Sequence, residues 1–416
     1  MSSERHSTAS DADTRIERAL ADLDPQHDVL SVTRALRRAL PPTLAREAAE
    51  RFDLRRRASE KFPHAARGRF TRKGIEQATR LPVARARAAR IAELAPGALC
   101  YDATCGLGAD AIALADAGLP VVAGDLDPTV VACARANLGA AGHPEWALVA
   151  NACNSPVLAS IVLLDPDRRA EGRRSLRPAE WSPTLEAALR IAARHDGACI
   201  KLAPAADHET LHDFLPPGLA YRLQWVSHER ELCEVALWTG SLAGTAEDEG
   251  GIHEVLALTS GRGPADSVLA GRPAEVVSPP PAEVSEIQWL CDPDPAVVRS
   301  GLLGRLATDL NLAPVGPGLA WLGGTSRPES PLLRSWKVLA HTSADPKRVR
   351  ALLREHEIGP VRVIKRGHPD RPEVLERRFR GRGSKRGLLA VARLEQGHVA
   401  LLLEGEGPPS EAGTTL

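Results

Sequence analysis

Short apolar runs alternate with helix-length segments between residues 98 and 245, and this alternation limits the possible folds more than any other feature of the chain. The apolar runs are residues 97–103, 120–127, 159–167 and 198–204. Helical patterns lie between them, at residues 109–118, 128–142 and 182–197. Alternation at these lengths is typical of βαβ units, so it predicts an α/β fold with a parallel sheet. Residues 221–240 predict two further strands around a polar turn, at an antiparallel edge.

A glycine turn follows the first predicted strand, in the sequence DATCGLGAD. Gly106 and Gly108 allow the backbone to approach a ligand closely, and the helix that follows presents unpaired N–H groups. Asp125 ends the second predicted strand, 23 residues after Asp102. A carboxylate at this place can accept hydrogen bonds from both ribose hydroxyls of an adenosine group. NAD and S-adenosylmethionine both contain this ribose, and a plain packing turn is the alternative without a ligand.

Two details favour S-adenosylmethionine over NAD. Asp102 stands at the start of the turn, where a carboxylate would repel a pyrophosphate but would compensate a cationic sulfonium ligand. The third predicted strand ends in LLDPD, residues 163–167, at the carboxyl edge where open α/β sheets bind ligands. An ordinary turn at the strand end is the structural alternative for this motif. The chain also offers no evident acid–base partner for hydride transfer, which disfavours an NAD-dependent oxidoreductase.

These motifs together resemble those of class I S-adenosylmethionine-dependent methyltransferases. The variant D-x-[TF]-C-G-x-G, here Asp102 to Gly108, is typical of nucleic-acid methyltransferases that include the trimethylguanosine synthase group. Segments such as EQAT, DPDRR, KLAP and VIKRG also resemble bacterial methyltransferases with a C-terminal THUMP-like domain, across about residues 35–405. The resemblance implies a Rossmann-like sheet, methyl transfer from S-adenosylmethionine, and a C-terminal module related to RNA-binding domains.

The resemblance also implies a set of cofactor-binding residues. Those of the turn and the ribose would be Asp102, Thr104, Gly106, Gly108 and Asp125. Thr79 would come from the segment before the first strand, which closes over the cofactor in these enzymes. Asn151 stands where many relatives have an aspartate that meets the adenine amino group. Asp110 either joins the hydrogen bonding of the turn or is an exposed acid at a helix start.

The DPDRR segment supplies the candidate catalytic residues, which are Asp165, Pro166, Asp167 and Arg168. In the amino-methyltransferases that this segment resembles, a [DNS]-P-P-[YFW] turn offers a side-chain oxygen and a main-chain carbonyl to the acceptor amine, and its aromatic ring stacks on the base. Asp165 and the Pro166 carbonyl can serve as such acceptors, but the second proline and the aromatic residue are absent. Arg168 can stack on a base or hold a phosphate. Arg169 can contact a phosphate or form a structural ion pair.

Two more residues near this edge have open roles. Trp181 can stack on a base or pack in the core, and Lys201 can face the pocket or lie at its rim.

Basic residues gather in two regions, although the chain as a whole has 53 Lys and Arg against 53 Asp and Glu. Residues 34–90 contain 17 basic and 5 acidic side chains, and residues 362–386 contain 10 and 3. Solvated surfaces would explain both regions, whereas phosphate contacts would favour RNA as the partner. In the second region, RRFRGRGSKRG predicts a mobile loop whose Arg378, Arg380 and Arg382 contact RNA phosphates.

The chain is divided by these patterns into six segments. They are a disordered N-terminus at 1–25, a helical region at 26–95, a methyltransferase domain at 96–260, a linker and connecting segment at 261–329, a THUMP-like α+β domain at 330–405 and a flexible tail at 406–416. The linker is predicted because Gly, Pro and Ser dominate residues 260–285.

The seven cysteines are scattered without a CxxC pair, which predicts no metal site and favours a reducing compartment. The polar N-terminus does not resemble a secretory signal, and no apolar stretch is long enough for a membrane span. We therefore expect a cytoplasmic monomer.

Three functions stay open from the sequence alone. The first is an RNA methyltransferase that uses S-adenosylmethionine. The second is a non-catalytic RNA-binding or assembly factor that keeps the methyltransferase fold. The incomplete DPDRR turn is the reason to consider it. The third is a methyltransferase for a small molecule or a protein, with incidental basic surfaces.

Overall fold

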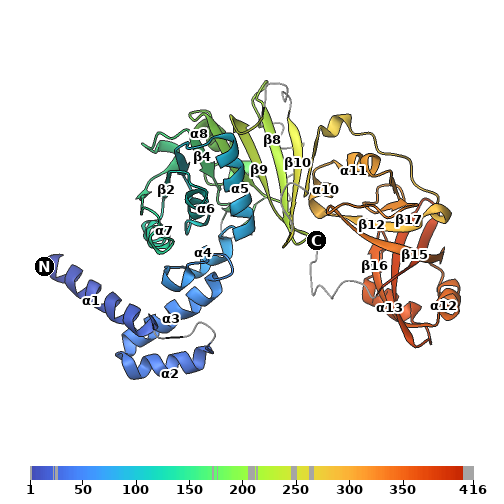
Figure 1. Ribbon diagram of the computed structural model, residues 1–416, viewed down its shortest axis with the longest axis horizontal. Coiled ribbons are helices and arrows are strands. Elements are labelled where there is room, and N and C mark those ends of the chain that lie inside the picture. Colours follow the sequence, from blue (N-terminus) through green and yellow to red (C-terminus); the bar gives the residue numbers. More distant parts are fainter. Residues whose placement is uncertain are drawn as a thin grey trace. The chain divides into compact units, whose positions relative to one another are not determined.

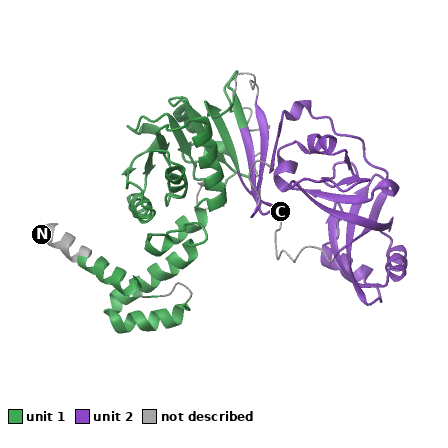
Figure 2. Cartoon of the chain, in the orientation of Figure 1, with its two compact units in different colours: residues 1–222, 235–250 green, residues 223–234, 251–416 purple. Residues whose placement is uncertain are grey.

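The computed structural model describes the backbone of residues 2–21, 23, 27–170, 173–175, 177–204, 211, 214–244, 251–261 and 267–405, and the side chains of these residues except 2–10, 169, 170, 173 and 174. The chain forms two compact units, Met1–Arg222 with Val235–Gly250 and Leu223–Glu234 with Gly251–Leu416 (Figure 2). The division falls inside the hairpin of β8 (Tyr221–His228) and β9 (Glu231–Gly240).

A parallel sheet forms the centre of the first unit and confirms the predicted α/β fold (Figure 1). Its strands are β1 (Cys100–Asp102), β2 (Val121–Asp125), β3 (Ala147–Val149), β4 (Ile161–Leu164) and β7 (Gly197–Leu202). They pair in parallel in the order β7-β4-β1-β2-β3, and β9 joins β7 in the antiparallel sense. The carboxyl ends of β1, β2 and β4 therefore meet at one edge, where the glycine turn, Asp125 and the DPDRR segment begin.

The hairpin at residues 221–240 is not the edge of the sheet, contrary to the prediction. The nine-stranded order is β11-β10-β8-β9-β7-β4-β1-β2-β3, with β10 (Ile252–Leu258) and β11 (Val268–Gly271) beyond the hairpin. β10 has five consecutive buried residues, which a strand at an open edge would expose.

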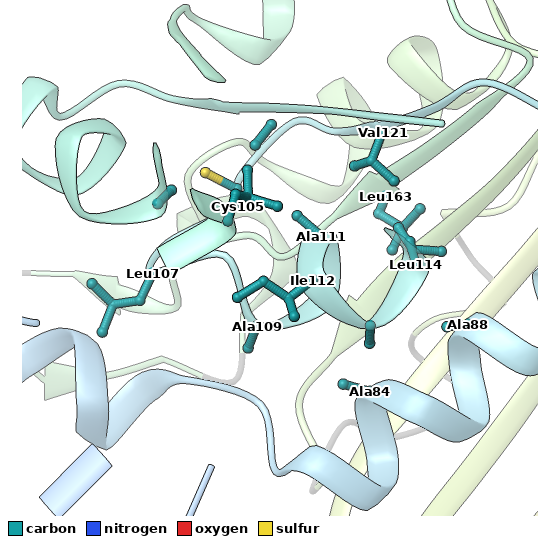
Figure 3. Close-up of a cluster of buried hydrophobic side chains, with 14 of the residues drawn as sticks. Ala84, Ala88, Cys105, Leu107, Ala109, Ala111, Ile112, Leu114, Val121 and Leu163 are labelled. Carbon is teal, nitrogen blue, oxygen red and sulfur yellow. The ribbon is translucent and has the colours of Figure 1, made fainter. Parts of the chain in front are cut away.

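The helices of this unit begin at residues that satisfy their first N–H groups. Asp127 accepts a hydrogen bond from the Thr129 N–H (2.8 Å) at the start of α7 (Pro128–Ala140), and Thr184 accepts one from Ala187 (3.2 Å) at α8 (Leu185–Ala192). Small residues allow close helix packing: Ala84 and Ala88 of α5 (Leu81–Leu94) lie in one buried cluster with residues of α6 (Ala109–Asp116) (Figure 3).

The N-terminus differs from the predicted disordered segment. It forms α1 (Ser2–Ala21), which packs against α3 (Pro42–Ala58), and α3 in turn packs against α2 (Val29–Ala39). Ile16 and Leu20 are buried in a small core with apolar side chains of α2 and α3. Two apolar residues one helical turn apart give this mostly polar helix a buried face, and the polar composition concealed them.

Residues 261–329 also differ from the predicted linker, apart from 262–266, which lie outside the described residues. This segment contains β12 (Trp289–Pro293), α10 (Pro295–Arg299), α11 (Leu303–Asp309), β13 (Ala313–Pro314) and β14 (Leu322–Gly324). β12 pairs with β15 (Leu333–Ser343), and Leu290 and Cys291 are fully buried. The strands are two to five residues long, so their stability depends on pairing with one another and, through β12, with β15 rather than on a local pattern.

The second unit is built on a seven-stranded sheet of order β13-β14-β12-β15-β18-β17-β16. Its C-terminal elements are α12 (Pro346–Glu355), β16 (Ile358–Arg366), α13 (Pro372–Phe379), β17 (Lys385–Leu394) and β18 (Gly397–Leu403). Apolar residues of α12 and α13 form one core with β16, β17 and β18, including Val349, Leu375 and Phe379. The predicted tail at 406–416 lies outside the described residues.

Candidate active site

The glycine turn after β1 leaves open space beside Gly106. Gly106 and Gly108 have left-handed φ angles of 52° and 85°, which side-chain-bearing residues rarely adopt. No atom lies within 4 Å of the place that a Cβ of Gly106 would take. The Cys105 N–H donates to the Gly124 carbonyl (2.9 Å), so the turn is held against the end of β2. Gly106 thus presents bare main chain in front of α6.

Asp125 lies directly beside this turn. Its Oδ2 accepts a hydrogen bond from the Gly106 N–H (3.1 Å) and its Oδ1 accepts one from the Asp127 N–H (3.1 Å). Each carboxylate oxygen keeps capacity for a further donor, such as a ribose hydroxyl. Leu126, the next residue, is 60% exposed and offers an apolar surface beside the carboxylate, which sequence reasoning did not single out.

Asp102 is buried, and its Oδ2 has no hydrogen-bond partner among the described residues. Burial raises the pKa of this carboxyl to about 7, the charge of Asp110 adds to the effect, and the charge of Lys201 opposes it. An unpartnered buried carboxylate is unfavourable unless a cation approaches it. The site is therefore suited to a positively charged ligand.

Asp110 is buried too, so it is not the exposed helix acid that the sequence left open. It accepts hydrogen bonds from Thr79 (2.8 Å) and Lys201 (2.5 Å), and pairs with Arg87 of α5. Burial acts to raise the pKa of Asp110, but Arg87 and Lys201 outweigh it and hold that pKa well below its usual range. Thr79 is brought here by the segment between α4 (Arg72–Gln77) and α5.

Lys201 lies inside the site rather than at its rim. Its Nζ donates to Asp110 Oδ2 (2.5 Å), Thr79 Oγ1 (2.6 Å) and Asp165 Oδ2 (3.1 Å). The Asp165 N–H in turn donates to Thr104 Oγ1 (2.5 Å). The structure thus brings Thr79, Thr104 and Asp165 together, although they come from three separate parts of the chain.

The rest of the DPDRR segment is partly ordered by main-chain contacts. Asp167 exchanges two hydrogen bonds with Ser182 (2.8 and 2.9 Å), and its carboxylate lies 3.6 Å from Lys73. Pro166 is buried, and Arg168 is half-buried. The side chain of Arg169 lies outside the described residues.

Two other candidates have contacts that limit their roles. Trp181 is 2% exposed and its Nε1 donates to the Ser175 carbonyl (3.1 Å), so it packs in the core and is not available to stack on a base. Asn151 is exposed, and its Oδ1 accepts from the Cys153 N–H (3.0 Å). Its contact with adenine stays a prediction.

The helical N-terminal region reaches the turn through α4. A Cβ on Gly74 would lie 2.6 Å from the Leu107 side chain, so glycine is needed for α4 to approach the turn. Lys61 donates to the carbonyls of Ile75 and Ala78 (2.7 Å each) and holds the end of α4 just before Thr79. Lys61 therefore holds the main chain that leads to Thr79, and the sequence motifs did not indicate this role.

The basic loop of the second unit is anchored, which corrects the prediction of a mobile loop. Phe379 is fully buried, and the N–H groups of Gly381 and Gly383 donate to Gly359 (2.8 Å) and Ile358 (3.1 Å) carbonyls. A Cβ on either glycine would collide with main-chain oxygen atoms of this neighbouring segment. The glycines thus serve close backbone packing.

The three predicted arginines of this loop are exposed. Arg378 pairs with Asp370 (2.6 Å), whereas the structure gives Arg380 and Arg382 no ion pair within the described residues.

No group of metal-ligating side chains occurs among the described residues. Burial raises the pKa of Cys100 to about 12 and that of Cys105 well above its usual value, so neither is a ready nucleophile. In the described parts of the chain, no helix is both long and apolar enough to cross a membrane.

Comparisons with known proteins show the family and the fold of the chain. Residues 333–405 match the family described as THUMP domain-like. An uncharacterized S-adenosylmethionine-dependent methyltransferase of Mycobacterium tuberculosis strain H37Rv is 32% identical over 358 residues, which cover 83% of this chain and 92% of the relative. The crystal structure of a candidate methyltransferase from Porphyromonas gingivalis W83 superposes with a TM-score of 0.71 at 18% identity, over 92% of this chain and 98% of that one.

The parallel sheet, with a glycine turn after β1 and an acid at the end of β2, has the fold of class I methyltransferases. The chain belongs to the S-adenosylmethionine-dependent methyltransferases, in the group with a C-terminal THUMP-like domain. Its residues fit the cofactor, because the open main chain at Gly106 and the unpartnered buried oxygen of Asp102 suit a ligand that carries an ammonium and a sulfonium.

Proposed function

We propose that the protein methylates RNA, at a nucleotide held by the turn of Asp165, Pro166, Asp167 and Arg168. The hydrogen bond from the Asp165 N–H to Thr104 Oγ1 carries this proposal, because it fixes the acceptor turn to the cofactor turn. Methyl transfer needs its two reactants aligned and close, and a direct tie between the two turns supplies that alignment.

We assign the cofactor to the residues that surround the open glycine turn. Asp125 would bind the ribose, with Leu126 against the adenine ring and Gly106 and Gly108 against the amino-acid portion. Asp102 would face the ammonium. S-adenosylmethionine supplies an electrophilic methyl group on its sulfonium. The remaining contributions are those of this chain: binding, orientation and exclusion of water.

Asp165 and the Pro166 carbonyl would accept hydrogen bonds from the acceptor group and aim its lone pair toward the methyl carbon. The Asp165 side chain is 38% exposed, so it is open to a substrate. Trp181 is buried, so it does not replace the aromatic residue that this turn lacks. Arg168, whose planar guanidinium can stack, is the candidate contact for a base.

The charges of the first unit support RNA as the substrate. Many arginines of α3 are neutralised, since Arg51 pairs with Asp13 and Glu17, and Arg56 and Arg57 pair with Asp53. Arg34, Arg37 and Arg38 of α2 are exposed, and they form no ion pair within the described residues. Unpaired arginines on one helix face suit a phosphate backbone.

A second candidate function is a non-catalytic RNA-binding factor. The absent second proline and aromatic residue favour it, because the acceptor turn is then incomplete.

The two candidates are separated by transfer of labelled methyl from S-adenosylmethionine to total RNA from cells that lack this protein. We expect label in one RNA class with the wild type, none with Asp165→Ala, and unchanged labelling with Asp116→Asn, an exposed acid of α6 that pairs with His143. Cofactor binding by the wild type without any labelled RNA would reject RNA methylation.

A further inference from the structure

We propose that Lys201 is a positioning residue for methyl transfer, because it holds the Asp165 carboxylate in place through a direct ion pair. This inference rests on the proposed function and goes beyond it, since Lys201 lies on β7 and belongs neither to the cofactor turn nor to the acceptor turn.

The three donors of the ammonium group all have acceptors. Lys201 Nζ lies 2.5 Å from Asp110 Oδ2, 2.6 Å from Thr79 Oγ1 and 3.1 Å from Asp165 Oδ2. The Lys201 side chain is 10% exposed, whereas the Asp165 side chain is 38% exposed. Lys201 is therefore a buried point against which a partly exposed carboxylate can be held.

The pairing leaves part of Asp165 available to a substrate. Its Oδ2 bonds to Lys201 and its N–H to Thr104, while Oδ1 forms no hydrogen bond within the described residues. The carboxylate thus has one oxygen fixed by the protein and one open. An acceptor amine or hydroxyl would meet that open oxygen in a defined direction.

The charges around the pair explain why a cation is needed at this position. Asp102 of β1 and Asp110 of α6 lie close enough to Asp165 and Lys201 for their charges to interact, and Arg87 of α5 pairs with Asp110. Without Lys201, Asp165 would face two other carboxylates. Like charges repel, so the Asp165 side chain would turn toward solvent, away from the cofactor turn.

A different result is expected if the role of Lys201 is purely structural. If Lys201 served only to compensate Asp110, its loss would weaken folding and cofactor binding together. If it positions Asp165, its loss lowers kcat without weakening cofactor binding. Removal of a positive charge does not lower the electrostatic attraction of this site for a cationic cofactor, so weaker cofactor binding in the variant would report a disturbed fold.

The experiment compares Lys201→Met and Lys201→Arg with the wild type in full-length protein. We expect Lys201→Met to lower kcat about 10- to 100-fold, because a misplacement near 1 Å costs up to about 100-fold. The dissociation constant for S-adenosylmethionine, measured by calorimetry, should stay equal or fall. Lys201→Arg keeps the charge and should recover part of kcat.

A double-mutant cycle with Asp165→Asn tests whether Lys201 acts through Asp165. Single-turnover transfer of label should show a large effect of Lys201→Met on the wild type and almost none on Asp165→Asn, as expected for residues that act as a unit. An equal effect in both backgrounds, or unchanged kcat, would overturn the proposal. If Lys201→Met does not fold, Lys201→Arg enters the same cycle.

Failure of the proposed function would be visible separately, as an inactive wild type. In that case, crystal structures of the wild type and the Lys201 variant test the positioning role. An Asp165 carboxylate that keeps its place without Lys201 would contradict that role.

Discussion

The main-chain N–H of Asp165 donates to the side-chain hydroxyl of Thr104 over 2.5 Å, and this bond joins the turn after β4 to the turn after β1. Thr104→Val removes the acceptor and leaves the N–H without its partner, at a cost of about 1–3 kcal/mol. We expect slower methyl transfer with little change in cofactor affinity. Thr104→Ser keeps the hydroxyl and should behave as the wild type, and equal rates for Val and Ser would refute the linkage.

Asp125 should be indispensable for cofactor binding. Its carboxylate already accepts from Gly106 and Asp127, so Asp125→Ala removes both the ribose acceptor and the contact that orders the turn. Calorimetry should detect no binding of S-adenosylmethionine at concentrations that saturate the wild type. Asp116→Ala, on the exposed surface of α6, serves as the control. Retained affinity in Asp125→Ala would exclude the ribose assignment.

Cofactor affinity and stability should both depend on pH through Asp102, whose pKa is raised to about 7 by burial and then by Asp110. Its pKa in the unfolded chain is about 3.9. Between these values the folded protein holds a proton that the unfolded chain has lost, so the free energy of unfolding falls as pH rises from about 4 to about 7. The fall amounts to at most about 4 kcal/mol.

The affinity for the cationic cofactor has the opposite dependence on pH, because the ionised carboxylate of Asp102 attracts this cofactor. Affinity of the wild type should rise between about pH 6 and about pH 8 with release of a proton, and Asp102→Asn should abolish the rise. Calorimetry in buffers of different ionisation enthalpy measures the released proton. A wild-type affinity that is flat over this range would contradict the assignment.

Helix α1 should contribute to stability despite its polar composition. Ile16 is 1% exposed, so Ile16→Ala should destabilise the first unit by about 2–4 kcal/mol. Val29→Ala, at a residue that is 38% exposed, is the matched control and should cost much less. Thermal unfolding followed by circular dichroism compares the two. Equal transitions for Ile16→Ala and the wild type would mean that α1 does not pack in solution.

The anchored basic loop should contribute to RNA affinity through Arg380 and Arg382. The double substitution R380Q/R382Q should weaken RNA binding and reduce the slope of log K against log salt by about 1.4, if each arginine contacts one phosphate of a single strand. R299Q/R305Q removes two arginines elsewhere in the same unit and should have little effect. Cofactor binding should be unchanged in both variants. Equal RNA affinity for the two variants would assign the loop to a solvated surface.

The sheet and the cofactor turn could be predicted because their signals are local. Buried parallel strands are continuous apolar runs, and a left-handed turn such as that at Gly106 and Gly108 favours glycine. The basic loop shows the limit of such reasoning. Its glycines suggested mobility, but they allow close approach to Gly359 and Ile358, residues more than 20 positions away in the chain.

The sequence by itself determined the fold class, the methyltransferase family and the residues at the carboxyl ends of β1, β2 and β4, since each of these depends on a pattern within a few consecutive residues. Only the tertiary structure decided that α1 packs through Ile16 and Leu20, that β12 to β14 join the second sheet, and that Lys201 bridges Asp110 and Asp165. The physical reason is that burial, strand pairing and ion pairing join segments distant in the chain, and no local periodicity records their partners.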